Sequence, residues 1–273
     1  MSIENKNDLY HYSDEELIKK WPGFESKYAQ VNGIKLHYVE GGEGEPLICL
    51  PGWPQTWYSF LTVAPDLAKH YRVFVIDIRG MGSSSKPESG YDKKTMAQDI
   101  YEFINLLGLG CVNVLGHDIG GMVAISLAFN YPELIAKLII MDGAHSSEGM
   151  MQMPLIPQME TFNAKMDGNA PYAWWMGFNQ VKDLPEKLLE GRFQYLLDWL
   201  FSYVMIDDSK MPAFDRAVYS MIESKADPED YLRVCSHSIL LYFFFLARGL
   251  GPALASMSFK VLSLNSVKAS ANF

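Results

Sequence analysis

The sequence contains few cysteines and no long apolar run, and each of these absences excludes a class of protein. Three cysteines, at positions 49, 111 and 235, are spread over 273 residues. Their spacing fits neither a disulfide framework nor a metal site, which favours a reducing, cytoplasmic compartment. The longest apolar run, Ile239–Ala247, is far shorter than the roughly 20 residues of a membrane-spanning helix, so we expect no membrane span.

Positive charge is also scarce. Lysine and arginine together number 23 against 32 aspartates and glutamates, which gives a net charge of −9. This surplus of negative charge argues against nucleic acid and anionic membrane surfaces as partners. The first 25 residues are polar and charged, without the apolar centre of a signal peptide. Acidic residues are absent from the segment 234–273, which makes that segment atypical.

Strand and helix patterns alternate between residues 46 and 142. Before them, an Asn32-Gly33 pair between two alternating runs predicts a hairpin. Short apolar runs typical of buried parallel strands follow at 46–50, 71–80, 112–117 and 135–143. Helices are predicted between them at 59–70, 95–110 and 121–133. This order is typical of an α/β fold with a doubly wound, mostly parallel sheet.

The predicted sheet brings three acidic residues and one loop to the same edge. Asp77, Asp118 and Asp142 each follow a predicted strand, and the loop 51–57 follows another. Ligands bind at the carboxyl ends of the strands in doubly wound sheets. We therefore expect the functional site at this edge.

The strand pattern stops after Asp142. Residues 146–233 have the pattern of helices and loops rich in methionine and aromatic residues, and we expect them to form a helical lid over the core, residues 1–145. Most of these aromatic side chains are expected to pack inside the lid. The segment 234–273 contains one further candidate strand, 260–264, and is expected to be an incomplete or divergent last part of the core.

The stretch VNVLGHDIGGMVA, residues 112–124, places an acid at a sharp turn. An apolar strand stops at Gly116, and a helix begins near Gly120 and Gly121. Glycine lets a strand and the following helix pass close together, and the side chain between them is lifted clear of the backbone. Asp118 then lies at a helix N-terminus, where N–H groups favour negative charge. An aspartate that only caps a helix is common, but the flanking glycines favour a nucleophile elbow.

A carboxylate at this turn suggests nucleophilic catalysis. Unlike a serine hydroxyl, an ionised carboxylate needs no base to become a nucleophile. It can attack a saturated carbon that carries a leaving group, and so open an epoxide or displace a halide. The product is an ester between the enzyme and its substrate. Water must then attack the carbonyl carbon of that ester, which requires a general base and an oxyanion hole.

Taken together, the motifs resemble the epoxide hydrolase branch of the α/β-hydrolase fold, which has relatives among haloalkane and haloacetate dehalogenases. The matching stretches lie between residue 28 and about residue 233: LPGWPQTWYSF, DIRGMGSSSKP, GHDIGGMVA, LIIMDGAH and FNQVKDLPEKLLEGR. The resemblance implies a hydrolase that opens a small apolar epoxide through an alkyl-enzyme ester and releases a diol. It implies no cofactor. The oligomeric state stays open, a homodimer included.

The resemblance also implies roles for individual residues. Asp118 matches the nucleophile, and the backbone N–H groups of Trp53 and Ile119 match the oxyanion hole. Pro51 stands where the family has a histidine at the start of that loop, a change that leaves the backbone donor in place. Asp142 matches an acid that orients the catalytic histidine in some members, whereas in others an acid at this place is only a solvated strand end.

Positions in the expected lid match substrate-binding residues of the family. Tyr231, within PEDYLR, matches a tyrosine that donates a hydrogen bond to the epoxide oxygen. Trp174 and Trp175 occupy the place of another donor, and paired tryptophans there also resemble a halide cradle. A haloalkane or haloacid dehalogenase is therefore an alternative. Against it, Ile119 and Met122 stand where such enzymes carry a tryptophan or arginines beside the nucleophile.

No histidine occupies the place of the family's catalytic base. The chain holds six: His11, His37, His70, His117, His145 and His237. His117 is expected to point away from the site. A nucleophile without a base would alkylate once and stall, which gives a third alternative, a catalytically impaired hydrolase-like protein that binds ligands. In the opposing interpretation, the segment 234–273 folds so that His237 returns to the site.

Overall fold

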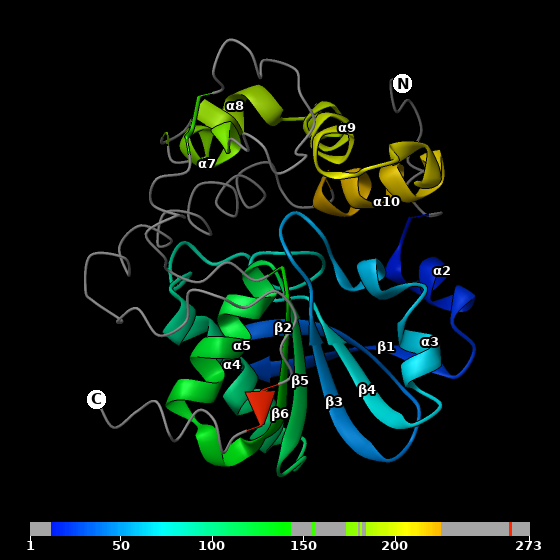
Figure 1. Ribbon diagram of the computed structural model, residues 1–273, viewed down its shortest axis with the longest axis vertical. Coiled ribbons are helices and arrows are strands. Elements are labelled where there is room, and N and C mark those ends of the chain that lie inside the picture. The colour runs from blue at the N-terminus through cyan, green and yellow to red at the C-terminus, as the bar shows by residue number, and fades with distance from the viewer. Residues whose placement is uncertain are drawn as a thin grey trace. The chain divides into compact units, whose positions relative to one another are not determined.

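The computed structural model describes residues 12–142, 154–156, 173–179, 181, 184–224 and 262–263 (Figure 1). The chain divides into two compact units. The first comprises Met1–His145 and Gly251–Phe273, and the second is Ser146–Leu250. Tyr231, His145 and His237 lie outside the described residues, as does the segment 234–273 apart from residues 262–263.

The described part of the first unit is built on a seven-stranded sheet in the order β1-β2-β4-β3-β5-β6-β7. Its strands are β1 (Phe24–Val31), β2 (Ile34–Gly41), β3 (Glu45–Leu50), β4 (Tyr71–Ile76), β5 (Val112–His117), β6 (Ile135–Met141) and β7 (Leu262–Ser263). The four neighbouring strands β4, β3, β5 and β6 are parallel, and the outer pairs are antiparallel. The doubly wound α/β fold predicted from the sequence is confirmed. The strand expected at 260–264 is present as β7, which pairs with β6.

The turn between β1 and β2 follows the predicted chemistry of its two residues. Asn32 has φ 45° and Gly33 has φ 74°, the left-handed conformations that a two-residue hairpin turn requires at both central positions. Val31 pairs with Ile34 directly across the turn. The predicted hairpin is therefore confirmed, with its register set by the turn.

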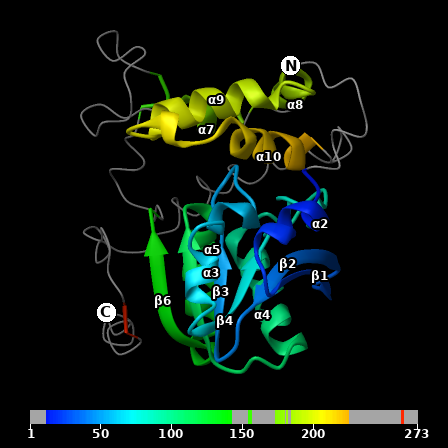
Figure 2. The same cartoon turned by 90° about the vertical axis from the view of Figure 1, so that its right-hand side faces the viewer.

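Helices cover both faces of the sheet (Figures 1 and 2). α4 (Lys93–Leu106) and α5 (Ile119–Asn130) pack side by side on one face, and the short α3 (Ala64–Leu67) lies on the other. α4 buries the residues that share its inner face: Met96, Ile100, Phe103 and Ile104. Three residues of β3, Ile48, Cys49 and Leu50, are fully buried, as expected for a strand with both faces covered. The core therefore lies between the sheet and these helices.

The helix expected at 59–70 is wrong in its extent. A 3-10 turn, η2 (Trp57–Phe60), begins at Thr56, whose side chain accepts a hydrogen bond from the Tyr58 N–H over 3.3 Å. Helix follows only at α3, which has a proline in its first turn. A proline lacks an N–H and fits the first turn of a helix rather than its interior. It therefore divides the predicted helix in two.

The described elements of the second unit are all helical. They are α7 (Trp174–Phe178), α8 (Leu184–Leu189), α9 (Phe193–Val204), η5 (Asp208–Lys210) and α10 (Ala213–Ser224). α9 packs against α10, where the rings of Phe201 and Tyr219 lie 5.8 Å apart. The helical character predicted for this part of the chain is confirmed, and its role as a lid stays a prediction. In the described parts of both units, no helix has the length and apolar character needed to span a bilayer.

The connections of β3 and β5 position the site. β3 and β5 are neighbours in the sheet, but the chain leaves β3 toward α3 on one face and leaves β5 toward α5 on the other. Loops that diverge from adjacent strands leave a crevice at their carboxyl ends, the usual ligand site of such sheets. The loop 51–57 and Asp118 both lie at this switch point.

Candidate active site

Asp118 occupies a strained turn between β5 and α5. Its backbone has φ 49° and ψ −118°, an unusual conformation for a residue with a side chain. The turn is so tight that side chains would clash with the backbone. A Cβ on Gly116 would lie 2.5 Å from the Gly120 oxygen, and one on Gly120 would lie 2.3 Å from the Leu50 oxygen. Only glycine fits at these two positions. Strain of this kind is common at functional sites, where the surrounding structure holds it.

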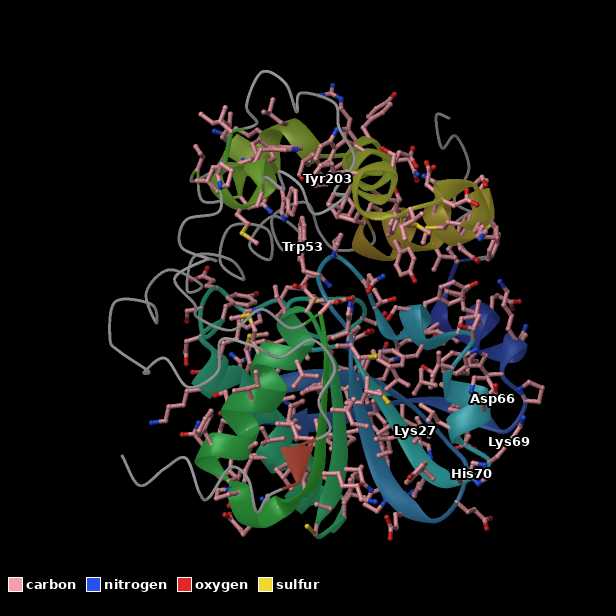
Figure 3. The ribbon with its side chains drawn as sticks, viewed as in Figure 1. Lys27, Trp53, Asp66, Lys69, His70 and Tyr203 are labelled. Carbon is pink, nitrogen blue, oxygen red and sulfur yellow. The ribbon has the colours of Figure 1, made fainter. Side chains whose placement is uncertain are left out.

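The loop after β3 closes onto the carboxylate of Asp118. The Trp53 N–H donates a hydrogen bond to Asp118 Oδ2 over 2.9 Å. A Cβ on Gly52 would lie 2.7 Å from Asp118 Cβ and 3.1 Å from Oδ2, so this close approach also depends on glycine. Trp53 lies at the carboxyl end of the sheet, whereas Asp66, Lys69 and His70 lie toward the opposite end of the same unit (Figure 3). The structure thus brings together Asp118 and the Trp53 N–H, as the sequence predicts.

Burial and hydrogen bonding act on the charge of Asp118 in opposite directions. Burial raises the pKa of Asp118 above its ordinary value. The backbone N–H groups of Ile119 and Trp53 and the charges of His117 and Lys93 each lower it against that effect. The same two N–H groups would stabilise an oxygen that becomes negative in a reaction at this carbonyl. The site therefore combines a carboxylate at a helix N-terminus with two donors on it.

The fold and this geometry agree with the comparison to known families. The family model described as alpha/beta hydrolase fold matches residues 45–219 of this chain. The chain belongs to the α/β-hydrolase family. This identification confirms the resemblance drawn from the elbow and loop motifs.

Relatives of this α/β-hydrolase include two kinds of enzyme. The chain is 46% identical to a soluble epoxide hydrolase from Corynebacterium sp. (strain C12) over 114 residues, 42% of this chain and 40% of that protein. It is 31% identical to a fluoroacetate dehalogenase from Burkholderia sp. over 174 residues, 61% of this chain and 53% of that protein. The solved structure of epoxide hydrolase CorEH without ligand has a TM-score of 0.64 and 31% identity, covering 79% of this chain and 73% of that one. The chain thus spans about half or less of the length of these two curated relatives.

Asp142 lies next to the elbow in the α/β-hydrolase sheet. It follows β6, is exposed and has φ 43°. The Asp118 N–H donates to the Met141 oxygen over 3.1 Å, so the two aspartates leave neighbouring strand ends. No hydrogen bond or ion pair joins Asp142 to an imidazole within the described residues, and its role as the acid that orients a histidine stays a prediction.

The expectation that His117 points away from the site is wrong. A Cβ built on Gly52 would lie 2.8 Å from His117 Nδ1, so the ring lies against the loop that closes onto Asp118. The reason is the narrow gap between the end of β5 and this loop. The charge of His117 also lowers the pKa of Asp118, a contribution that the sequence motif does not indicate.

Trp174 and Trp175 form part of an aromatic cluster within the second unit. Their rings lie 5.1 Å and 6.1 Å from that of Trp199 on α9, and the Trp175 ring lies 5.7 Å from Tyr203. Both indoles are half-buried. Part of each ring therefore packs α7 against α9. Their predicted contact with substrate, like that of Tyr231, stays a prediction.

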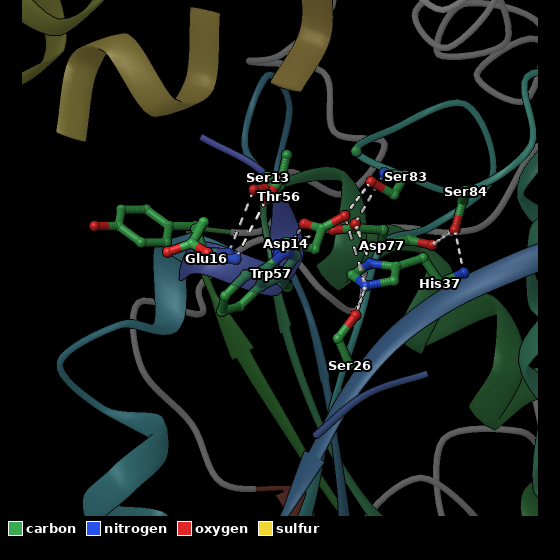
Figure 4. Close-up of polar contacts among 12 residues, drawn as sticks. Ser13, Asp14, Glu16, Ser26, His37, Thr56, Trp57, Asp77, Ser83 and Ser84 are labelled. Atoms are coloured by element: carbon green, nitrogen blue, oxygen red, sulfur yellow. Dashed lines mark hydrogen bonds and ion pairs between the residues drawn. The ribbon is translucent and has the colours of Figure 1, made fainter. Parts of the chain in front are cut away.

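A buried polar network lies in the first unit, and no pattern in the sequence predicted it (Figure 4). His37 Nδ1 lies 2.7 Å from Asp77 Oδ2, and His37 Nε2 lies 2.9 Å from Ser26 Oγ. Asp77 also accepts a hydrogen bond of 2.7 Å from the Trp57 N–H, and the Trp57 indole donates to Asp14 over 2.7 Å. His37 and Asp77 are fully buried, so Asp77 holds the loop after β3 rather than facing the site edge. The partners come from separate strands and helices, which no local motif reveals.

Proposed function

We propose that this α/β-hydrolase opens small apolar epoxides with Asp118 as the nucleophile. The observation that carries the proposal is the carboxylate of Asp118 at the switch point, with the Trp53 N–H on Oδ2 at 2.9 Å. A serine hydrolase is disfavoured because the elbow position is an aspartate. The similarity to epoxide hydrolases supports the substrate class.

In the first step, a carboxylate oxygen of Asp118 attacks one carbon of the epoxide. The new bond is an ester C–O bond, and the bond that breaks joins the same carbon to the ring oxygen. The ring oxygen leaves as an alkoxide and takes up a proton. We assign the hydrogen bond to this oxygen to Tyr231, because a phenol stays protonated at neutral pH and donates well.

In the second step, water attacks the carbonyl carbon of the ester. The N–H groups of Trp53 and Ile119 stabilise the resulting oxyanion, and its collapse releases the diol and restores the carboxylate. A general base must take the proton from the water. Asp142 would orient an imidazole for this task. Whether the step runs at a useful rate decides between an active hydrolase and the impaired, ligand-binding alternative.

The test is the mass of the intact protein after incubation with styrene oxide. An epoxide adds without losing an atom, so we expect a mass increase equal to that of the epoxide, located on Asp118 by peptide mapping. Asp118→Asn should give no adduct, and Asp66→Asn, at an exposed site away from the loop, should react like the wild type. A transient adduct with diol production supports an active hydrolase, and a persistent adduct supports a stalled one. Neither adduct nor diol from the wild type would refute the proposal.

Dehalogenation is the second candidate function. The adjacent Trp174 and Trp175, together with the similarity to a fluoroacetate dehalogenase, support it. Ile119 and Met122 leave no arginine beside the nucleophile for a substrate carboxylate, which favours a neutral haloalkane over a haloacid. Halide release from 1-bromobutane and from fluoroacetate should be measured beside diol production from styrene oxide. If halide release is faster than diol formation, dehalogenation becomes the favoured function and epoxide opening the second candidate.

A further inference from the structure

The short helix α2 (Asp14–Leu17) supplies a buried carboxylate that the reaction proposed above does not use. Asp14 is the first residue of this helix and is only 6% exposed. Its Oδ1 atom accepts a hydrogen bond of 2.7 Å from the Trp57 indole, and its Oδ2 atom accepts one from the Ser83 hydroxyl (Figure 4). An aspartate is rarely buried to this extent unless it is paired. The groups that Asp14 binds therefore indicate its role.

Trp57 is held by two carboxylates at once. Its indole N–H donates to Asp14 Oδ1 over 2.7 Å, and its backbone N–H donates to Asp77 Oδ1, also over 2.7 Å. Trp57 is fully buried, and hydrogen bonds to a carboxylate are about twice as strong as those between neutral groups. Neither the backbone nor the ring of Trp57 can therefore move without breaking one of these bonds.

Trp57 stands at the end of the loop that carries the oxyanion donor. Earlier in the same loop, the Trp53 N–H donates to Asp118 Oδ2 over 2.9 Å. The chain turns between these two tryptophans, where the Gln55 N–H donates to the Gly52 oxygen over 2.8 Å. One end of this short loop is fixed by β3 and the other by Trp57. The position of the Trp53 N–H therefore depends on the anchor at Trp57.

We propose that Asp14 is a positioning residue for the oxyanion hole. By holding the Trp57 indole, it keeps the end of the loop after β3 in place, and the loop in turn aims the Trp53 N–H at the carboxyl group of Asp118. The inference rests on the proposed function, since the donor is needed where the alkyl-enzyme ester is hydrolysed. It goes further by giving a part in the reaction to α2, which precedes every motif of the family resemblance.

The kinetic consequence falls on the second chemical step. Asp14→Ala should slow hydrolysis of the ester by about tenfold, because a displaced N–H stabilises the oxyanion less well. Loss of a donor outright costs about 10²–10³, and the effect is smaller here because Trp57 keeps its backbone bond to Asp77. Alkylation should not be slowed, since a carboxylate with a weaker hydrogen bond is more basic. The ester should therefore accumulate, as measured by single-turnover mass spectrometry with styrene oxide, whereas damage to the fold would slow both steps.

A double-mutant cycle tests whether Asp14 acts through the indole. Trp57→Phe keeps an aromatic ring and the backbone N–H but has no indole N–H to donate. Asp14→Ala and Trp57→Phe should each lower the ratio of ester hydrolysis to alkylation, and the double variant should be no worse than the more impaired single one. Asp14→Asn, which keeps an oxygen acceptor, should retain most of the wild-type ratio. Losses that multiply in the double variant would mean that Asp14 acts by another route, and the inference would be wrong.

Two neighbouring residues provide matched controls. Glu15 is exposed, and Glu15→Gln removes an equal charge one position along the same helix. Ser13→Ala removes the hydroxyl that caps α2, which accepts a hydrogen bond of 3.3 Å from the Glu16 N–H, and so weakens the helix without removing a partner of Trp57. Neither change should alter the ratio of ester hydrolysis to alkylation. If either lowers this ratio as much as Asp14→Ala does, the effect is one of net charge or helix stability, and the inference fails.

The closing experiment measures hydrogen exchange of the Trp53 backbone N–H by NMR of protein labelled with ¹⁵N-tryptophan, with Trp53→Phe used to assign the signal. It needs no substrate, so it tests the inference even if the wild type fails to react with styrene oxide. We expect exchange about tenfold faster in Asp14→Ala and Trp57→Phe than in the wild type or Glu15→Gln, through local opening of the loop. An unchanged rate in Asp14→Ala, or in Trp57→Phe if Asp14→Ala does not fold, would overturn the inference.

Discussion

Gly52 is the residue whose size decides how closely the loop after β3 approaches Asp118. Gly52→Ala would place a Cβ 2.7 Å from Asp118 Cβ, a distance that forces the loop away. The Trp53 N–H would then lose its hydrogen bond to Oδ2. Removing one donor of an oxyanion hole costs about 10²–10³ in rate, and we expect a loss of this size in hydrolysis of the alkyl-enzyme ester, measured by single-turnover mass spectrometry.

The control for this change is Gly108→Ala. A Cβ there meets nothing within 4 Å, but the backbone has φ +60°. This substitution should lower the free energy of unfolding by about 1 kcal/mol through backbone strain and leave the ester chemistry unchanged. If Gly52→Ala keeps the wild-type rates at full stability, the loop does not form the proposed oxyanion hole.

His37 is a single residue on which the buried network depends. Burial alone would lower the pKa of His37, but the hydrogen bond and charge of Asp77 and the charge of Asp14 outweigh it, so the pKa is raised. The stabilisation from its positive charge is therefore fully present below the unfolded pKa of about 6.5 and is lost as the pH rises through the folded pKa.

We predict that His37→Gln lowers the free energy of unfolding by about 3 kcal/mol at acidic pH, because it leaves the buried Asp77 without its cationic partner. The difference between wild type and variant should shrink over the range in which the pH rises from the unfolded pKa of about 6.5 through the raised folded pKa. Urea unfolding followed by tryptophan fluorescence measures it, since Trp57 lies in the network. A difference that is constant across this range would mean that the imidazole is neutral when buried.

At the scale of elements, α4 begins at a capped end. Asp92 accepts hydrogen bonds from the Thr95 N–H over 2.8 Å and from Thr95 Oγ1 over 2.6 Å. Burial raises the pKa of Asp92, but these hydrogen bonds outweigh it and the pKa is lowered. The stabilisation is therefore present above the unfolded pKa of about 3.9 and is lost as the pH falls through the folded pKa.

Asp92→Ala should cost about 1 kcal/mol at neutral pH, as the loss of an N-cap usually does. The cost should decrease in strongly acidic solution, where the wild-type carboxylate is protonated as well. Chemical unfolding at several pH values measures the loss in free energy of unfolding at neutral and at acidic pH. Asp66→Ala, which removes an exposed carboxylate, should cost clearly less than Asp92→Ala. An equal cost for both variants would contradict a capping role for Asp92.

Local patterns predicted the elements that local chemistry determines. The Asn32-Gly33 turn, the apolar strands and the amphipathic α4 follow from turn residues and periodicity alone. The helix expected at 59–70 failed because Thr56 and a proline each start a short helical turn of their own. The elbow was accessible from glycine spacing, but the contact of His37 with Asp77 joins separate elements, and only the fold brings these two residues together.

At the scale of the whole molecule, the chain leaves the sheet after β6 and returns to it at β7. The residues between these strands include all of the second unit, Ser146–Leu250. Each unit has buried aromatic residues in its described part: Phe103 on α4 is fully buried in the first, and Phe193 on α9 is 2% exposed in the second. Domains with cores of their own commonly violate two-state unfolding. The two units are therefore expected to lose structure in separable steps.

Hydrogen exchange in increasing urea, followed by mass spectrometry of peptides, resolves these steps. Replacing a buried phenylalanine by alanine costs about 3–5 kcal/mol in the core that contains it. Phe193→Ala should remove protection from peptides of α9 and α10 at lower urea, while peptides of β3 and β5 keep their wild-type behaviour. Phe103→Ala should have the reverse effect, because its ring contacts Tyr38 and Phe74 of the sheet. If either variant lowers the protection of both sets of peptides together, the units unfold as one, and the insertion between β6 and β7 is an integral part of the sheet's stability.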